Sequence, residues 1–160
     1  MKALVVYFSR SGYTRQVAEA IAAQLGADIE CVREFRGRSG ILGYLRSMRE
    51  ALQKRTVPIR EPARLPSDYD LVIIGTPVWA SNMCSPVRAY ISAHRDSLGR
   101  IALFCTQGGS GATKVLSRVA ELCAHRPVAT LIVNDDEITK DRYADKLNGF
   151  LKALALPQAA

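Results

Sequence analysis

The chain has 160 residues, of which 48% are hydrophobic and 23% are charged. This length and composition are typical of one globular domain, and they exclude intrinsically disordered, collagenous and disulfide-scaffold proteins. The formal net charge is +7, and most of it lies between Arg33 and Arg64, where nine basic residues stand against three acidic ones. A local basic surface is therefore predicted.

No apolar run reaches the roughly 18 residues that a membrane span needs. The apolar start of the chain ends in Ser9-Arg10-Ser11-Gly12, without the small-residue cleavage site of a signal peptide. We therefore expect a cytoplasmic protein.

Strand-like and helix-like segments alternate along the first part of the chain. Residues 3–8 form a short apolar run rich in Val and aromatic residues, which predicts a buried strand. Apolar residues then recur at four-residue spacing from Val17 to Leu25, and Gly26 ends the predicted helix. A less apolar strand is predicted over 28–32, nearer an edge of the sheet.

The stretch 35–66 interrupts this alternation. Within it Ile41, Leu45, Met48 and Leu52 recur at helical spacing, so we predict an extra amphipathic helix over about 39–55 that packs on the domain through this apolar face. The alternative is a surface-seeking helix that binds anionic lipid or nucleic acid. The polar face of the helix carries the basic residues Arg46, Arg49, Lys54 and Arg55.

Three more strands are predicted over 71–74, 101–105 and 128–133, with helices between them and a last helix over about 143–154. Strands that are apolar throughout are usually covered on both faces, so the pattern predicts a doubly wound α/β/α sandwich around a five-stranded parallel sheet. We expect one domain over 1–156 and a frayed tail over 157–160. No metal site is expected, and buried or half-buried thiols are predicted for Cys31, Cys84, Cys105 and Cys123.

The loop after the first strand is rich in hydroxyl groups. Ser9, Ser11 and Thr14 stand with Gly12 at the start of a helix, whose unpaired N–H groups carry partial positive charge. These donors fit a phosphate dianion, although a polar turn with an N-cap serine has the same composition. The patterns GxxxxGK[ST] and GxGxxG are both absent from this loop.

Two more loops reach the same edge of the sheet, where ligands of open parallel sheets bind. Trp79 lies in the loop after the third strand, where it would stack on a planar ligand or cover the end of the sheet. Gly108, Gly109 and Gly111 follow the fourth strand, where exposed N–H groups would bind a heterocycle or form a flexible turn. Together the three loops favour a phosphorylated planar heterocycle.

Two segments carry a resemblance to a known family. The family is the flavodoxin-like family of small FMN-binding proteins. Its phosphate loop resembles the segment 7–14, Tyr-Phe-Ser-Arg-Ser-Gly-Tyr-Thr. Its first flavin loop resembles the segment 75–79, Gly-Thr-Pro-Val-Trp. The resemblance covers about residues 2–154 and implies FMN as the cofactor. It implies phosphate binding by Ser9, Arg10, Ser11, Gly12, Tyr13 and Thr14. It implies that the flavin ring is lined by Thr76, Pro77, Val78, Trp79 and Ala80, with Trp79 against the face of the ring. It also implies that the pyrimidine end of the ring is approached by Thr106, Gln107, Gly108, Gly109 and Ser110.

The chain departs from typical flavodoxins in its basic charge, its extra helix and its third loop, which has neither a tyrosine nor an acidic residue. We therefore expect one open flavin face and no acid near the ring. Two functions fit these features. The first is electron transfer through non-covalently bound FMN, and the second is NAD(P)H-dependent reduction of FMN or a quinone.

A receiver domain of similar topology is disfavoured, because the third strand ends in Ile74-Gly75-Thr76 where a receiver needs an aspartate. The basic segment 33–64 is expected to dock an acidic partner or an anionic substrate such as NADPH, with a solvated basic face as the alternative. We expect no nucleic-acid partner, no membrane span and no catalytic side chain.

Overall fold

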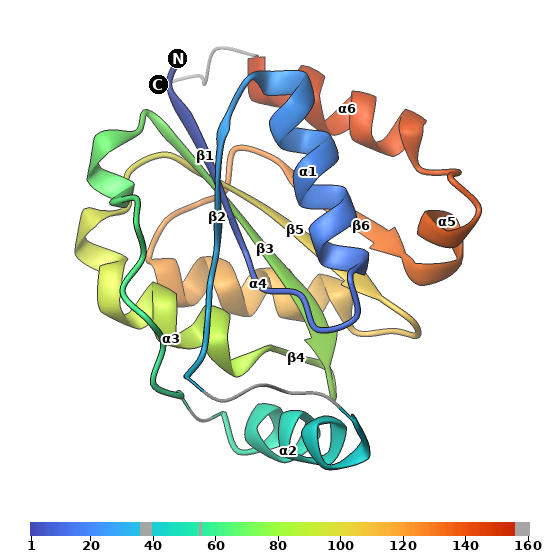
Figure 1. Ribbon diagram of the computed structural model, residues 1–160. Coiled ribbons are helices and arrows are strands. Elements are labelled where there is room, and N and C mark those ends of the chain that lie inside the picture. Colours follow the sequence, from blue (N-terminus) through green and yellow to red (C-terminus); the bar gives the residue numbers. More distant parts are fainter. Residues whose placement is uncertain (36–39, 55, 156–160) are drawn as a thin grey trace.

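The computed structural model describes residues 1–35, 40–54 and 56–155. Five parallel strands lie in the order β2-β1-β3-β5-β6, which confirms the predicted doubly wound sheet with β2 at an edge (Figure 1). Because β2 and β3 lie on opposite sides of β1, the strand order reverses there. The strands are β1 (Ala3–Tyr7), β2 (Asp28–Cys31), β3 (Leu71–Trp79), β5 (Ile101–Gln107) and β6 (Thr130–Asn134).

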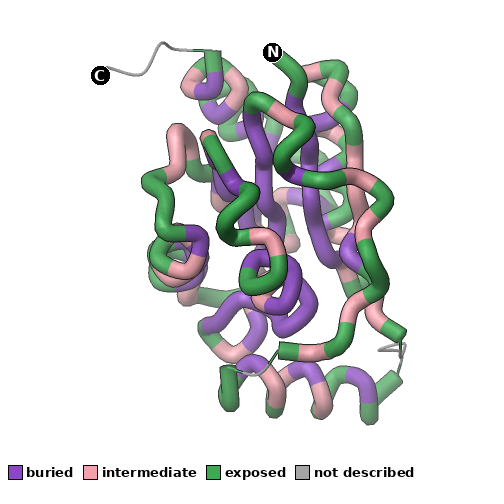
Figure 2. Tube along the Cα trace, turned by 90° about the vertical axis from the view of Figure 1, so that its left-hand side faces the viewer, coloured by how far each residue is buried: buried purple, intermediate pink, exposed green. Residues whose placement is uncertain are grey.

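Helices cover both faces of the sheet (Figure 1). α1 (Tyr13–Leu25) and α6 (Ala144–Ala155) lie on one face, and α3 (Ser85–His94) and α4 (Ala112–Cys123) lie on the other. Alternate residues of β1 therefore enter two different hydrophobic clusters, with Val5 on the α1 side and Leu4 on the α3 side. Figure 2 shows the strands as a buried centre between half-buried helices. Burial on both faces explains why these strands are apolar throughout.

Shorter elements complete the described chain. α5 (Asp135–Thr139) precedes α6, and single 3₁₀ turns lie at Pro66–Asp68 and Arg95–Ser97. No helix among the described residues is long and apolar enough to cross a membrane. The predicted tail, 157–160, lies outside the described residues, as does residue 156.

The third strand extends further than predicted. β3 continues to Trp79, turns at Ala80 and Ser81, and pairs antiparallel with β4 (Asn82–Met83). Ala80 and Ser81 have φ angles of 47° and 57°, as a tight two-residue hairpin turn requires. Such turns are usually marked by Gly or Asn, and neither stands at these two positions. The prediction that Trp79 lies in a loop is therefore wrong, because a hairpin holds it.

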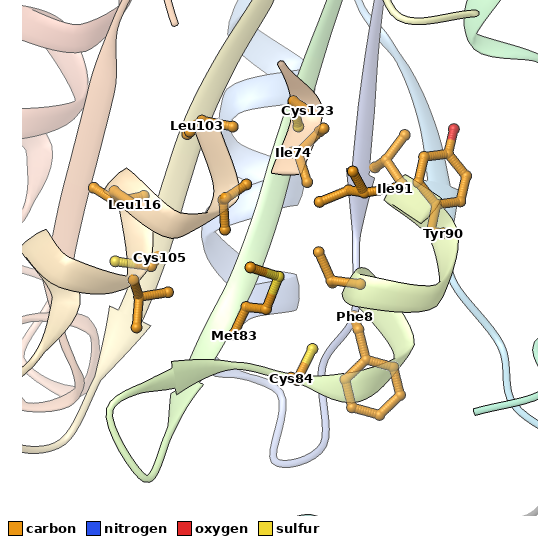
Figure 3. Packing of buried hydrophobic residues seen from close by; sticks show 14 of the residues in the cluster. Phe8, Ile74, Met83, Cys84, Tyr90, Ile91, Leu103, Cys105, Leu116 and Cys123 are labelled. Carbon is orange, nitrogen blue, oxygen red and sulfur yellow. The ribbon is translucent and has the colours of Figure 1, made fainter. Parts of the chain in front are cut away.

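The hairpin closes the core on the α3 side of the sheet. Figure 3 shows Met83 and Cys84 at the lower end of this cluster with Phe8 nearby, and Tyr90 beside Ile91 further up. Three of the four cysteines are buried and Cys31 is half-buried, as predicted, and none of the four forms a disulfide.

The extra helix is confirmed as α2 (Gly40–Leu52), and Figure 1 shows it beyond the carboxyl ends of the strands, next to β4. Residues 39 and 55, the predicted ends, lie outside the described residues. The prediction of its packing face is wrong. The side chains of Ile41, Leu45 and Leu52 are 80%, 57% and 65% exposed, and Met48 is half-buried.

α2 packs instead through a stripe of small residues at four-residue spacing. Gly43, Ser47 and Ala51 are buried, and the Ser47 hydroxyl donates to the Gly43 carbonyl at 2.7 Å. Small side chains let the helix backbone approach the rest of the domain closely, which the larger apolar residues would prevent.

Ionic contacts fix α2 and reduce the free charge of the basic segment. Glu50 accepts a hydrogen bond from the Ser85 hydroxyl at 2.9 Å and pairs with Arg46, also at 2.9 Å. Arg46 lies 3.5 Å from Glu34 as well. Arg64 likewise lies within 4.0 Å of carboxylates of β2. The exposed basic side chains of the described part of this segment are Arg33, Arg49, Lys54 and Arg60, whereas Arg36, Arg38 and Arg55 lie outside the described residues.

Candidate ligand-binding site

The loop after β1 presents unpaired amides at the start of α1. The Ser9 hydroxyl accepts a hydrogen bond from the Gly12 N–H at 3.0 Å, which folds the loop back on itself. Gly12 has a φ of 100°, a conformation open mainly to glycine, and it precedes the first helical residue, Tyr13. No side chain among the described residues caps this helix, so its first N–H groups point out of the helix end without an intrahelical partner.

A hydroxyl pair joins this loop to the loop after β5. The hydroxyl oxygens of Thr14 and Thr106 lie 2.8 Å apart, and both residues are buried. Thr14 was predicted to hold phosphate and Thr106 to approach a heterocycle. The structure brings both to one place through a direct hydrogen bond.

The β3–β4 hairpin is fixed from inside and from α4. The Thr76 hydroxyl accepts a hydrogen bond from the Cys84 N–H at 3.1 Å, and Arg118 of α4 donates to the Ser81 carbonyl and to the Asn82 side chain. Trp79 packs edge-on against Phe8 with ring centroids 5.6 Å apart. Only 7% of Trp79 is exposed, so the protein itself covers most of its ring.

The third loop is anchored through Gln107. Its side chain donates to the Asn134 side-chain oxygen at 3.0 Å and accepts from the Ala112 N–H at 3.0 Å. Gly108 lies against Asp135, because a β-carbon added at Gly108 would be 3.0 Å from the Asp135 carboxylate. The loop is therefore connected to the end of β6.

These loops and α2 enclose a cavity of about 340 Å³, called here the loop cavity. It lies at the carboxyl ends of β1 and β3, where the strand order reverses. Its volume is within the range of small-molecule sites. The predicted residues that line it are Arg10, Ser11, Tyr13, Thr14, Pro77, Val78, Trp79, Ala80, Thr106, Gln107 and Gly108.

Other predicted site residues lie behind or beside the lining. Ser9 and Gly12 shape the turn of the first loop, and Thr76 directs its hydroxyl to Cys84 rather than into the cavity. Gly109 and Ser110 are exposed at the tip of the third loop.

Four lining residues were missed by sequence reasoning: Tyr44, Ser47, Met48 and Asp135. The first three come from α2. The spacing of Gly43, Ser47 and Ala51 is the signal that would have shown which face of α2 turns inward.

Asp135 brings a carboxylate to a cavity that was expected to lack one. Burial raises its pKa above the ordinary carboxyl value, and the neighbouring carboxylate of Asp136 raises it further. It begins α5, whose capping box joins Asn134 and Glu137.

A larger cavity of about 660 Å³ lies along the edge strand β2 and the segment 59–64. Arginine and glutamate side chains both line it, including the Arg64–Glu30 pair. It touches only Ser9 of the three predicted site loops. The loop cavity is therefore the better candidate site.

Comparisons with known proteins agree with this fold. The sequence model of the family described as Flavodoxin matches residues 2–149. A flavoprotein in complex with FMN from Lactobacillus acidophilus NCFM is similar at 24% identity and a TM-score of 0.71, covering 87% of this chain and 97% of that one. A candidate flavoprotein from Bacteroides eggerthii DSM 20697 has 21% identity, a TM-score of 0.77 and coverage of 98% and 99%. Oxidised flavodoxin 1 from Bacillus cereus has 16% identity, a TM-score of 0.56 and coverage of 99% and 100%.

Proposed function

The chain belongs to the flavodoxin family, and on this premise we propose that it binds FMN non-covalently in the loop cavity and transfers electrons through it. The observation that carries the proposal is the uncapped start of α1 at the wall of this cavity. Unpaired amides and the positive end of a helix dipole suit a phosphate dianion. The similar flavoprotein from L. acidophilus was solved in complex with FMN.

The first loop would hold the phosphate. Ser9 keeps the turn closed through Gly12, and Ser11, Tyr13 and Thr14 bring hydroxyl or amide donors to it. Arg10 is exposed beside the cavity and adds positive charge. The phosphate-binding set is proposed to be Ser9, Arg10, Ser11, Gly12, Tyr13 and Thr14.

The second and third loops would hold the flavin ring. Pro77, Val78, Trp79 and Ala80 form one part of the lining, behind which Thr76 fixes the hairpin. Backbone N–H groups of the third loop would bind the polar end of the ring, from the set Thr106, Gln107, Gly108, Gly109 and Ser110. FMN supplies the chemistry when bound, because it accepts and releases one or two electrons.

The chain itself would tune the cofactor through charge. The carboxylate of Asp135 lines the cavity and would disfavour the negative charge that flavin gains on reduction. With the ring in this cavity, Asp135 would lower the reduction potential, in contrast to the expectation of no acid near the ring.

Equilibrium binding tests this proposal. The purified chain is titrated with FMN and, as the matched control, with riboflavin, which has the same ring and no phosphate. We expect one FMN per chain and riboflavin binding weaker by about tenfold or more, because charge-assisted hydrogen bonds to phosphate are strong. Equal affinity for both would contradict the assigned phosphate loop, and no binding of either would contradict the whole proposal.

Two redox roles follow from the same site. In the first, the chain carries electrons to or from a partner enzyme; in the second, it oxidises NAD(P)H and reduces FMN or a quinone. The observation that favours the second is a third loop whose lining residues carry no aromatic side chain. Anaerobic mixing of the FMN-loaded chain with NADPH or NADH separates them, since rapid bleaching of the flavin supports a reductase, and no bleaching without a partner supports a carrier.

The exposed basic residues would recruit the partner or nucleotide. Arg49 and Lys54 are exposed on and just after α2, and α2 lines the loop cavity. Charge complementarity of this kind raises the association rate and is screened by salt. Charge reversal of Arg49 and Lys54 is expected to slow reduction or partner oxidation at low ionic strength and to remove most of its salt dependence.

A further inference from the structure

We infer that Tyr44 of α2 is the aromatic side chain that contacts the ring of the bound flavin. The inference rests on the proposed FMN binding and assigns a binding role to α2. Three aromatic residues line the described part of the loop cavity, namely Tyr13, Tyr44 and Trp79.

Two of these three are less available to a ligand. Trp79 is 7% exposed and already packs edge-on against Phe8, so little of its ring can meet another molecule. Tyr13 opens α1 beside the proposed phosphate loop, and its hydroxyl accepts a hydrogen bond from Thr139 at 3.4 Å. Tyr44 lines the cavity and is 48% exposed, more than either of the other two.

α2 is held on the domain through residues other than Tyr44. The helix is seated through Gly43, Ser47 and Ala51, and Glu50 joins it to α3 through Ser85. The polar partner of the Tyr44 ring is Arg10, whose guanidinium carbon lies 5.3 Å from the ring centroid. This cation–π contact links α2 to the proposed phosphate loop and holds the ring beside the cavity.

The neighbouring residues fit a planar apolar ligand. Met48 lies one helical turn after Tyr44 and lines the same cavity, and its polarizable side chain adapts to flat surfaces. The third loop contributes Thr106, Gln107 and Gly108 to the lining, with no aromatic side chain among them. Tyr44 therefore offers an aromatic contact from α2, whereas the part of the cavity that the third loop lines has none.

Replacement of Tyr44 tests the inference with two readouts that do not depend on turnover. Tyr44→Ala is expected to weaken FMN binding by about tenfold, since an aromatic contact contributes beyond the area that it buries. The fluorescence of bound FMN is expected to rise, because a stacked tyrosine quenches it. Tyr44→Phe should keep the affinity, because its ring can still stack, but lose the quenching, because quenching needs the electron-rich phenol. Tyr44→Leu, which keeps apolar bulk and helix propensity, should lose both the affinity and the quenching.

The matched control is Leu45→Ala, a neighbour on α2 that is also exposed and does not line the cavity. It should bind FMN with wild-type affinity and fluorescence, and circular dichroism should show unchanged helix content in all four variants. Tyr44 variants that match Leu45→Ala in affinity and quenching would overturn the inference and leave the FMN site standing. Failure of the wild-type chain itself to bind FMN would overturn both proposals.

Discussion

The ring of Phe104 on β5 fills the space where a side chain of Gly75 on β3 would lie. The two residues are register partners in adjacent strands, and a β-carbon added at Gly75 would be 2.0 Å from the Phe104 Cζ. Gly75 stands just before the part of β3 that lines the loop cavity, so this contact joins the core to the site.

Gly75→Ala is therefore expected to lower the free energy of unfolding by about 3 kcal/mol, since overpacking forces the ring or the strand to move. Urea denaturation measures the change. The double variant Gly75→Ala with Phe104→Leu should be more stable than Gly75→Ala alone, because the smaller side chain relieves the clash. A double variant that is less stable than either single variant would show that a contact other than the one with Phe104 determines the destabilisation by Gly75→Ala.

The hydrogen bond between Thr14 and Thr106 should show measurable coupling. Thr14→Val removes one partner and leaves a buried hydroxyl without it, at a cost of about 1–2 kcal/mol. Thr106→Val should cost a similar amount, and the double variant should cost less than the two single changes together. If the loss of stability in the double variant equalled the sum of the losses in the two single variants, the two hydroxyls would not stabilise each other.

Asp135 should make the stability of the fold depend on pH. Because burial raises its pKa in the folded chain, the carboxyl group of Asp135 keeps its proton to a higher pH in the folded chain than in the unfolded chain. Its contribution to stability is therefore largest below about pH 4, the ordinary carboxyl value, and falls as pH rises through the raised pKa. Denaturation of the wild type and of Asp135→Asn from acid to neutral pH should show the wild type losing stability relative to the variant.

Asp136→Asn is the control for this series, because Asp136 is exposed and neighbours Asp135. This change removes the Asp136 carboxylate, which is the smaller of the two causes of the raised pKa of Asp135. It should therefore reduce the pH dependence of stability seen in the wild type without abolishing it. If the free energies of unfolding of the wild type and of Asp135→Asn differed by the same amount at every pH, a raised pKa of Asp135 would be contradicted.

The end of α4 offers a stabilising change. Ala124 follows this helix with φ 56° and ψ 29°, and its N–H donates to the carbonyls of Ala120 and Glu121. Glycine adopts this left-handed conformation without the strain of a β-carbon. Ala124→Gly should raise the free energy of unfolding by about 0.5–1 kcal/mol in thermal or urea denaturation. Ala23→Gly, at an exposed position within α1, should instead lower it by about 1 kcal/mol.

The sheet and the main helices were predictable because their patterns are local. Apolar runs such as 71–74 are too short for a helix, and the residues from Val17 to Leu25 repeat at helical spacing. The placement of three loops at one sheet edge followed from the parallel order of the strands. Their closeness in the structure is visible in the Thr14–Thr106 pair.

The remaining features depend on contacts that are distant in sequence. The turn at Ala80 and Ser81 uses left-handed angles without glycine, so nothing local marks it. α2 buries Gly43, Ser47 and Ala51 rather than its larger apolar residues, because its place on the domain demands close backbone approach. Asp135 lines the loop cavity only because β6 ends beside Gly108.

The bonds among the loops have a consequence for ligand entry. Thr14 with Thr106, Gln107 with Asn134 and Arg118 with the hairpin connect each loop to another part of the protein. Conformational entropy is thus given up when the chain folds rather than when a molecule arrives. A ligand therefore meets a preorganised site, and its complex should form with little rearrangement of the backbone.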